Sequence, residues 1–261
     1  MFRNLQIEWM KIKNYRVFQV FSILYLAGII VIIYIFYKWY MALTGRLTGR
    51  DEVDIFQLFS PDSIWATVCF FTSFLLYLPG MIIINLFSNE VNFKTHRQNI
   101  IDGWKRETFI YTKIGLILCI CLVVTIMNLI ATWMMCSIIH IDFSVTSGLK
   151  TLSLSFIQTF IYLMFALLLA IVFRRSGVAI IVFFIYGLIL EFLFMWLFWK
   201  VIPGAQYFLP LQSADSLIPF KPANQGLYGE YPGLTSVLIA TLLYAAVYVT
   251  FAVRKYKFDD L

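Results

Sequence analysis

Residues 88–113, SNEVNFKTHRQNIIDGWKRETFIYTK, form the longest strongly charged interruption between two long apolar runs. Within it, THRQ at 95–98 matches the capping box of a helix start, and Gly103 can supply a left-handed C-terminal stop. Four side chains recur at helical spacing and share one face: Phe93, Arg97, Ile100 and Trp104. The stretch predicts a short helix outside the bilayer that offers an apolar and cationic face to a partner. A solvated helix resting on the lipid headgroups is the alternative.

The composition on either side of this stretch is that of a membrane protein. Apolar residues make up 61% of the 261 positions, and charged residues only 13%. The mean hydropathy is +0.84. Soluble domains usually carry about 25% charged residues. The sequence therefore predicts an all-α polytopic membrane protein that forms a single transmembrane domain over 1–261.

Six apolar runs are long enough to cross a hydrocarbon core, which takes about 20 residues. They lie at 17–37, 63–87, 113–139, 149–173, 177–199 and 235–253. The connecting segments on the same side of the membrane as the N-terminus hold 14 of the 20 Lys and Arg residues. The positive-inside rule then places both termini, and the charged region 88–112, in the cytoplasm. This orientation fits a multi-pass protein of the cell's inner (plasma) membrane.

Two further segments are expected to be structured outside the spans. Residues 1–16 set Phe2, Leu5, Trp9 and Ile12 on one stripe beside cations, which is typical of an amphipathic helix in the interface. An extra-membrane coil is the alternative there. Residues 200–234 hold five of the seven prolines but are rich in Phe, Tyr and Leu. They predict an ordered outer cap or shallow re-entrant element before the sixth span, with an ordinary loop as the alternative. The loop 38–62 is expected to be short and solvated.

Several classes of chemistry find no support in the sequence. The four cysteines lie inside predicted spans, no CxxC spacing exists, and the two histidines fall on opposite sides of the membrane. No metal site, cofactor site or intramembrane metalloprotease is therefore predicted. The chain lacks even a Gly-Lys dipeptide, so it holds no P-loop. We expect no catalytic residue in this chain and no nucleic-acid partner.

Polar groups inside the spans are the remaining candidates for function, because each is costly in hydrocarbon. The amides Asn85, Asn128 and Gln158 are expected to form hydrogen bonds between helices. Glu191 has no charged residue within eight positions on either side. It is protonated, or it pairs with a polar group of another segment, or it faces a cavity. It is expected roughly 21 Å along the fifth span, in the outer half of the core, where a hydrogen bond to a backbone group of the 200–234 cap or to Asn128 or Gln158 would satisfy it.

This arrangement resembles the permease subunit of an ABC exporter of the type 2 class. In that family an acidic residue ends span two, a helix containing Thr and Arg follows, and a basic residue and a Lys lead into span three. The corresponding positions here are Glu90, Thr95, Arg97, Arg106 and Lys113. The architecture covers the whole chain, whereas the motif covers about 25 residues.

The resemblance implies that a cytosolic ABC ATPase, which binds ATP and Mg²⁺, docks on the coupling helix between spans two and three. The docking residues would be Glu90, Thr95, Arg97, Ile100, Trp104 and Arg106. It also implies that two six-span chains, as a homodimer or with a similar partner, surround a translocation path. A membrane scaffold in an ATPase-driven secretion or motility machine is the second hypothesis, and an intramembrane enzyme is the third.

Overall fold

Every regular element in the described part of the chain is helical. The computed structural model describes residues 8–10, 12–13, 15–44, 59–61, 63–95, 106–220 and 231–258. A segment in hydrocarbon must satisfy its backbone groups internally, and a helix does so without a partner. Six helices within these residues are long and apolar enough to cross a membrane. The predicted all-α, six-span architecture is therefore confirmed.

Four of the six spans are single continuous helices, and two are interrupted. The continuous ones are α2 (Arg16–Thr44), α7 (Arg106–Ile139), α8 (Val145–Phe173) and the last span, α13 (Leu234–Phe258). The second span is α4 (Ile64–Ser73), the 3₁₀ turn η1 (Phe74–Leu76) and α5 (Tyr77–Asn92). The fifth is α9 (Ser176–Phe184), the π-helix η2 (Ile185–Leu190) and α10 (Glu191–Val201).

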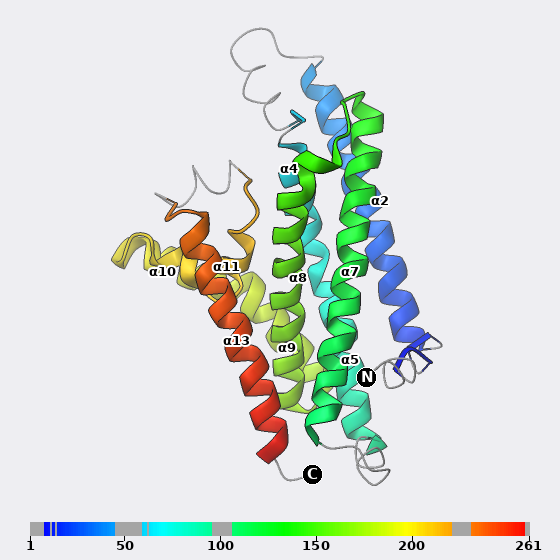
Figure 1. Ribbon diagram of the computed structural model, residues 1–261, viewed down its shortest axis with the longest axis vertical. Helices are drawn as coiled ribbons and strands as arrows, with labels where there is room; N and C mark the ends of the chain where they lie inside the picture. The colour runs from blue at the N-terminus through cyan, green and yellow to red at the C-terminus, as the bar shows by residue number, and fades with distance from the viewer. Residues whose placement is uncertain are drawn as a thin grey trace.

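Helix α8 is the centre of the bundle. It contacts α4, α5, α7, α9 and α13. Figure 1 shows it between α13 and α7, with α2 on the far side of α7. Its side chains at Ile161, Leu163, Met164 and Leu167 are fully buried. Polar side chains on α8 are consequently placed where several spans can reach them.

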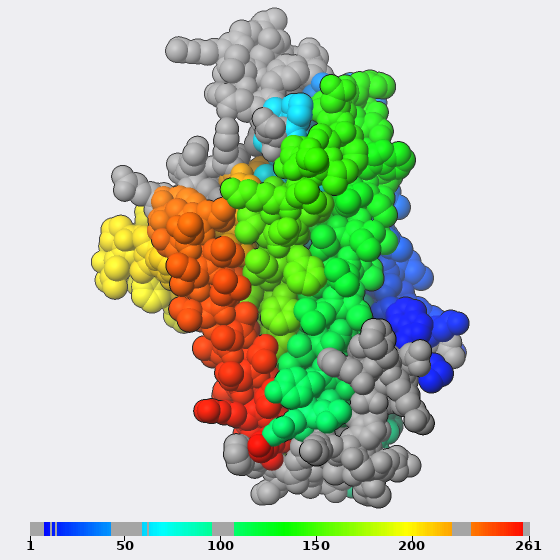
Figure 2. All heavy atoms as spheres, viewed as in Figure 1, coloured from blue at the N-terminus to red at the C-terminus, as the bar shows by residue number. Residues whose placement is uncertain are grey.

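The fifth span changes direction at its π-helix. Figure 1 shows α10 running across the long axis of the bundle, and Figure 2 shows it projecting from the side of the packed helices. A π-turn inserts an extra residue into the helical ladder and commonly accompanies a bend. Because the bend precedes Glu191, the depth of this residue does not follow from counting along a straight helix.

The segment between α10 and α13 is packed onto the bundle at residues 202–220. It contains the 3₁₀ turn η3 (Ala205–Phe208) and the short helix α11 (Gln212–Asp215). Tyr207, Leu217 and Ile218 are fully buried in a cluster with side chains of α4, α8 and α13. Tyr244 of α13 donates a hydrogen bond to the Phe208 carbonyl at 2.9 Å. The proline-rich segment is thus built into the fold.

Three expectations differ from the structure or lie outside it. Helix α2 continues to Thr44, so the first seven residues of the predicted loop 38–62 are helical. On the predicted N-terminal stripe, Ile12 is buried but Trp9 is exposed, and Phe2 and Leu5 lie outside the described residues. The predicted coupling helix also lies outside them beyond Thr95, including Arg97, Ile100 and Trp104.

Candidate functional site

Glu191 joins the fifth span to the segment that follows it. It is the first residue of α10, and its side chain is 4% exposed. Its Oε1 accepts hydrogen bonds from the backbone N–H groups of Leu211 at 2.6 Å and Gln212 at 2.8 Å. The first N–H groups of a helix have no partner within the helix, so the carboxylate satisfies donors at the start of α11. The expected contact between Glu191 and a backbone group of the 200–234 segment is present.

Asp215, at the other end of α11, is held by the central helix. Gln158 donates from Nε2 to its Oδ1 at 2.8 Å, and the Tyr162 hydroxyl lies 2.9 Å from both carboxylate oxygens. Gln158 and Tyr162 are four residues apart on α8 and therefore share a face. Burial raises the pKa of Asp215 to about 6, and the two hydrogen bonds oppose this rise. Helix α11 is thus fixed at both ends by a carboxylate.

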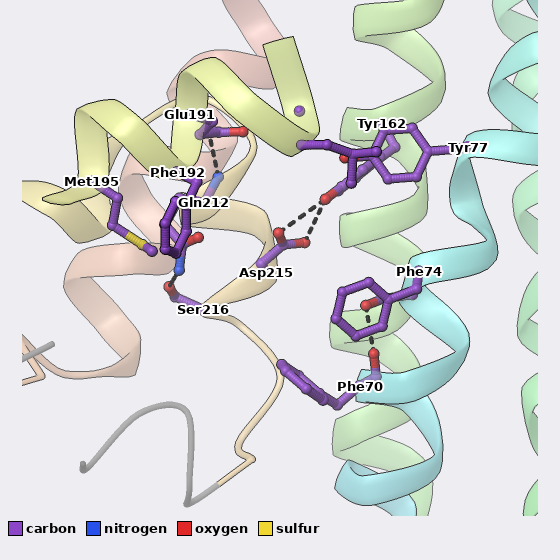
Figure 3. Close-up of a pocket in the computed structure, with 13 residues that line it drawn as sticks. Phe70, Phe74, Tyr77, Tyr162, Glu191, Phe192, Met195, Gln212, Asp215 and Ser216 are labelled. Atoms are coloured by element: carbon purple, nitrogen blue, oxygen red, sulfur yellow. Dashed lines mark hydrogen bonds between the residues drawn. The ribbon is translucent and has the colours of Figure 1, made fainter. Parts of the chain in front are cut away.

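A cavity of about 260 Å³ lies between these carboxylates and the second span. Figure 3 shows Asp215 hydrogen-bonded to Tyr162, with Phe70 and Phe74 on the neighbouring second span. Five aromatic rings line the cavity: Phe70, Phe74, Tyr77, Tyr162 and Phe192. Its remaining lining consists of small, polar or flexible residues: Ser73, Gly187, Leu188, Met195, Gln212 and Ser216. The site is concave, mostly apolar and equipped with a few convergent polar groups, as ligand sites commonly are.

The π-helix lets the second and fifth spans approach closely beside the cavity. A Cβ atom on Gly187 would lie 2.2 Å from the Tyr77 hydroxyl oxygen. The Tyr77 ring also stacks on Phe184, with centroids 5.1 Å apart. Single π-turns often occur at functional sites. Here the π-helix and its glycine set the position of one cavity wall.

The three amides predicted within the spans have different partners. Asn128 of α7 donates to Ser155 of α8 at 2.8 Å, which is a bond between helices. Gln158 binds Asp215 of α11. Asn85 instead donates to the Met81 carbonyl of its own helix at 2.9 Å, so the expected bond between helices is wrong for this residue. None of the three amides binds Glu191.

A second polar cluster is buried where the second span ends and the third begins. Lys113 of α7 lies 2.5 Å from a carboxylate oxygen of Glu8 and 2.8 Å from one of Glu90. All three residues are at most 9% exposed. Glu8 belongs to the helical residues 8–10, and Glu90 lies in the last turn of α5. One ammonium group therefore ties the N-terminal segment to two spans.

The remaining residues expected to dock an ATPase are placed differently from one another. Glu90 is turned into the bundle by Lys113 rather than toward a partner surface. Thr95 is exposed, and its hydroxyl donates to the Glu90 carbonyl at 3.3 Å. Arg106 is the first residue of α7. Arg97, Ile100 and Trp104 lie outside the described residues.

The aromatic lining of the cavity was not predicted from the sequence, and neither were three residues that form the polar contacts of the cavity or of the second cluster: Glu8, Tyr162 and Asp215. Asp215 carried a usable signal, because it is a lone acid in the apolar stretch LPLQSADSLIPF at 209–220. Glu8 lies on a short basic segment, where an acidic residue suggests an ordinary solvated ion pair. Tyr162 lies within an apolar run, and interfacial or core packing is the usual role of such a residue.

Comparison with protein families gives one result. The family described as "Protein of unknown function (DUF2705)" matches residues 47–261, and the chain belongs to this family. The match includes the cavity and also Glu90 and Lys113, but it begins after Glu8. No curated protein and no solved structure matches the chain.

Proposed function

We propose that this member of the DUF2705 family is the transmembrane permease subunit of an ATP-driven exporter. A separate cytosolic ATPase binds ATP and Mg²⁺, and this chain forms the path of the cargo and has no catalytic residue of its own. The protein lies in the plasma membrane with both termini in the cytoplasm. The proposal accounts for two separate polar sites in the membrane domain: the buried cluster around Lys113 and the cavity beside Glu191.

The observation that carries the proposal is the buried contact of Lys113 with Glu8 and Glu90. A transport subunit must pass movement of its ATPase to the spans, which requires a rigid connection at the cytosolic end. Removing one member of a buried ion pair is strongly unfavourable, because a buried charge loses its partner. The cluster therefore makes the N-terminal segment, α5 and α7 move together. In this proposal, residues 95–104 receive the ATPase and connect directly to the same two spans.

The cavity beside Glu191 favours transport over a scaffold role. A scaffold needs rigid packing but no hollow between its spans. Here, two carboxylates and five aromatic side chains line a space of about 260 Å³. In the proposed assembly, two six-span chains pair as a homodimer or with a similar chain. Their measured mass in mild detergent tests this pairing, and a monomer that transports by itself contradicts it.

The ATPase partner is tested by purification from the native membrane. The tagged chain, solubilised in mild detergent, is expected to carry a P-loop protein that mass spectrometry identifies and that hydrolyses ATP with vanadate sensitivity. Substitution of Ile100 and Trp104 with Ser is expected to remove this ATPase while the membrane domain remains folded. The matched control substitutes Ser for Val145 and Leu149, two exposed apolar residues at the start of α8. Full ATPase recovery with the 100/104 variant contradicts the docking assignment.

The scaffold alternative predicts the same copurified ATPase but no movement of solute. Vesicles reconstituted with the chain and its ATPase separate the two functions. ATP-dependent movement of a cargo supports the exporter. The scaffold is supported by a different outcome: the chain stimulates the ATPase, but the vesicles transport none of the compounds that bind the chain.

A further inference from the structure

The cavity beside α11 is lined by two acidic residues and by no cationic one. Glu191 and Asp215 both line it, and no Lys or Arg is among its lining residues. Neither carboxylate forms an ion pair within the described part of the chain. A concave site with walls of low dielectric constant focuses the field of such charges. The cavity therefore attracts cations and repels anions.

One carboxylate oxygen in this cavity has no hydrogen-bond donor. The two backbone N–H groups both go to Oε1 of Glu191, and no described residue donates to its Oε2. Figure 3 shows Glu191 above Gln212, at the side of the cavity opposite Phe70 and Phe74. The residue as a whole is 4% exposed, but Oε2 is not among the fully buried polar atoms that lack a partner, so this oxygen is accessible. A cationic group with N–H donors, or a charged methylammonium, satisfies this oxygen.

The opposite wall is aromatic. Phe70 and Phe74 form an edge-to-face pair with centroids 5.7 Å apart, and Tyr77 meets Tyr162 edge-on at 5.8 Å. Aromatic faces attract cations, most strongly where water is excluded, and they also bury apolar groups. Phe74 and Phe192 are each 57% exposed in the single chain, so the cavity is accessible from the side that these two rings line.

We propose that this cavity binds an amphipathic organic cation, an amine or quaternary ammonium group attached to an apolar body. The carboxylates Glu191 and Asp215 face the charge, and the rings of Phe70, Phe74 and Phe192 face the apolar body. A zwitterionic lipid headgroup fits less well, because its phosphate would meet the same two carboxylates. That the cation is the exported cargo rests on the proposed function, whereas its binding does not.

The test is direct binding to the purified chain in an uncharged maltoside detergent. The probe is radiolabelled phenyltrimethylammonium, followed by equilibrium dialysis, and benzenesulfonate is the probe of opposite charge on the same ring. We expect saturable binding of the cation and no saturable binding of the sulfonate. Equal affinity for the two compounds, or no saturable binding of the cation, overturns the proposal.

Variants then locate the site. Asp215→Asn and Glu191→Gln are each expected to weaken cation binding at least about tenfold, because each removes an acidic group that can face the cation as a carboxylate in a poorly solvated site. Asp142→Asn is the matched control, since Asp142 is exposed in the α7–α8 connection and does not line the cavity. Unchanged affinity in both folded cavity variants overturns the assignment.

A ring variant keeps the test decisive if the charge variants fold poorly. Phe74→Leu retains an apolar side chain at an exposed position and removes the π-face, so we expect about two- to fivefold weaker binding. Wild-type affinity in this variant contradicts the aromatic wall. Cation binding without any copurified ATPase rejects the exporter but keeps this site. An ATPase complex that does not bind the cation rejects this site alone.

Discussion

The backbone N–H of Gln212 donates to Oε1 of Glu191 at 2.8 Å, so the first residue of α10 holds the first residue of α11. Glu191→Ala leaves this N–H and that of Leu211 without an acceptor. Each buried unsatisfied group costs about 1–3 kcal/mol, so we expect a clear fall in the thermal unfolding temperature in detergent. Glu191→Gln keeps an acceptor oxygen and is expected to unfold near the wild-type temperature. Equal losses in the two variants contradict the hydrogen-bonding role.

The Asp215 carboxyl predicts a pH dependence of cation binding. Its pKa is raised by burial to about 6, so the group is neutral below that pH and negatively charged above it. Binding of phenyltrimethylammonium is therefore expected to strengthen as the pH rises from about 5 to about 7. Dialysis at a series of pH values measures this change. The Asp215→Asn variant should lose the part of the change centred near pH 6, and an identical profile in that variant contradicts the assignment.

The buried cluster around Lys113 predicts a large loss of stability on neutralisation of the cation. Lys113→Met removes the ammonium group that both buried carboxylates of Glu8 and Glu90 contact, which we expect to cost about 3–5 kcal/mol. Adding Glu8→Gln to the same chain should restore part of this loss. Lys257→Met is the control, because its pair with Glu107 at 2.6 Å is exposed and should contribute only about 0–1 kcal/mol. Equal effects of the two Met variants on the unfolding temperature would refute the prediction.

Gly187 predicts a steric effect on the cavity wall. Gly187→Ala places a Cβ 2.2 Å from the Tyr77 hydroxyl oxygen, and overpacking of this kind typically costs about 1–3 kcal/mol. We expect a lower unfolding temperature and weaker cation binding. Adding Tyr77→Phe removes the hydroxyl and should recover part of both. Gly177→Ala is the matched control, because nothing lies within 4 Å of its added Cβ.

The architecture could be predicted from sequence because hydrocarbon imposes a simple rule. A long apolar run in hydrocarbon must be helical, and the number of spans follows from counting the runs that are long enough to cross the bilayer. The bend in the fifth span could not be predicted, because IYGLIL at 185–190 is as apolar as its neighbours and is compatible with a straight helix. The π-helix is observed beside Tyr77 of another span, and tertiary contacts of this kind do not appear in a local pattern.

The candidate site was predictable on one side only. An energetic argument identified Glu191, since an isolated acid in an apolar run requires a partner. Its neighbour Asp215 lies in a proline-rich segment, where acids are common in solvated loops, so its burial depends on the packing of 202–220 against α8. Similarly, Glu8 and Lys113 are 105 residues apart, and no spacing rule relates them.

The order of synthesis gives the bond between Glu191 and Leu211 a consequence for membrane insertion. Leu211 follows Glu191 by 20 residues, so the fifth span leaves the ribosome before its hydrogen-bond donors have emerged. An acidic side chain at the centre of a span opposes insertion by about 2.5–3.5 kcal/mol, which the surrounding Phe, Leu and Trp residues must outweigh alone. Asp215 is in the reverse position, because Gln158 and Tyr162 precede it in the chain. The nascent fifth span therefore reaches its final position only after α11 has emerged and docked on a central helix that is already in place.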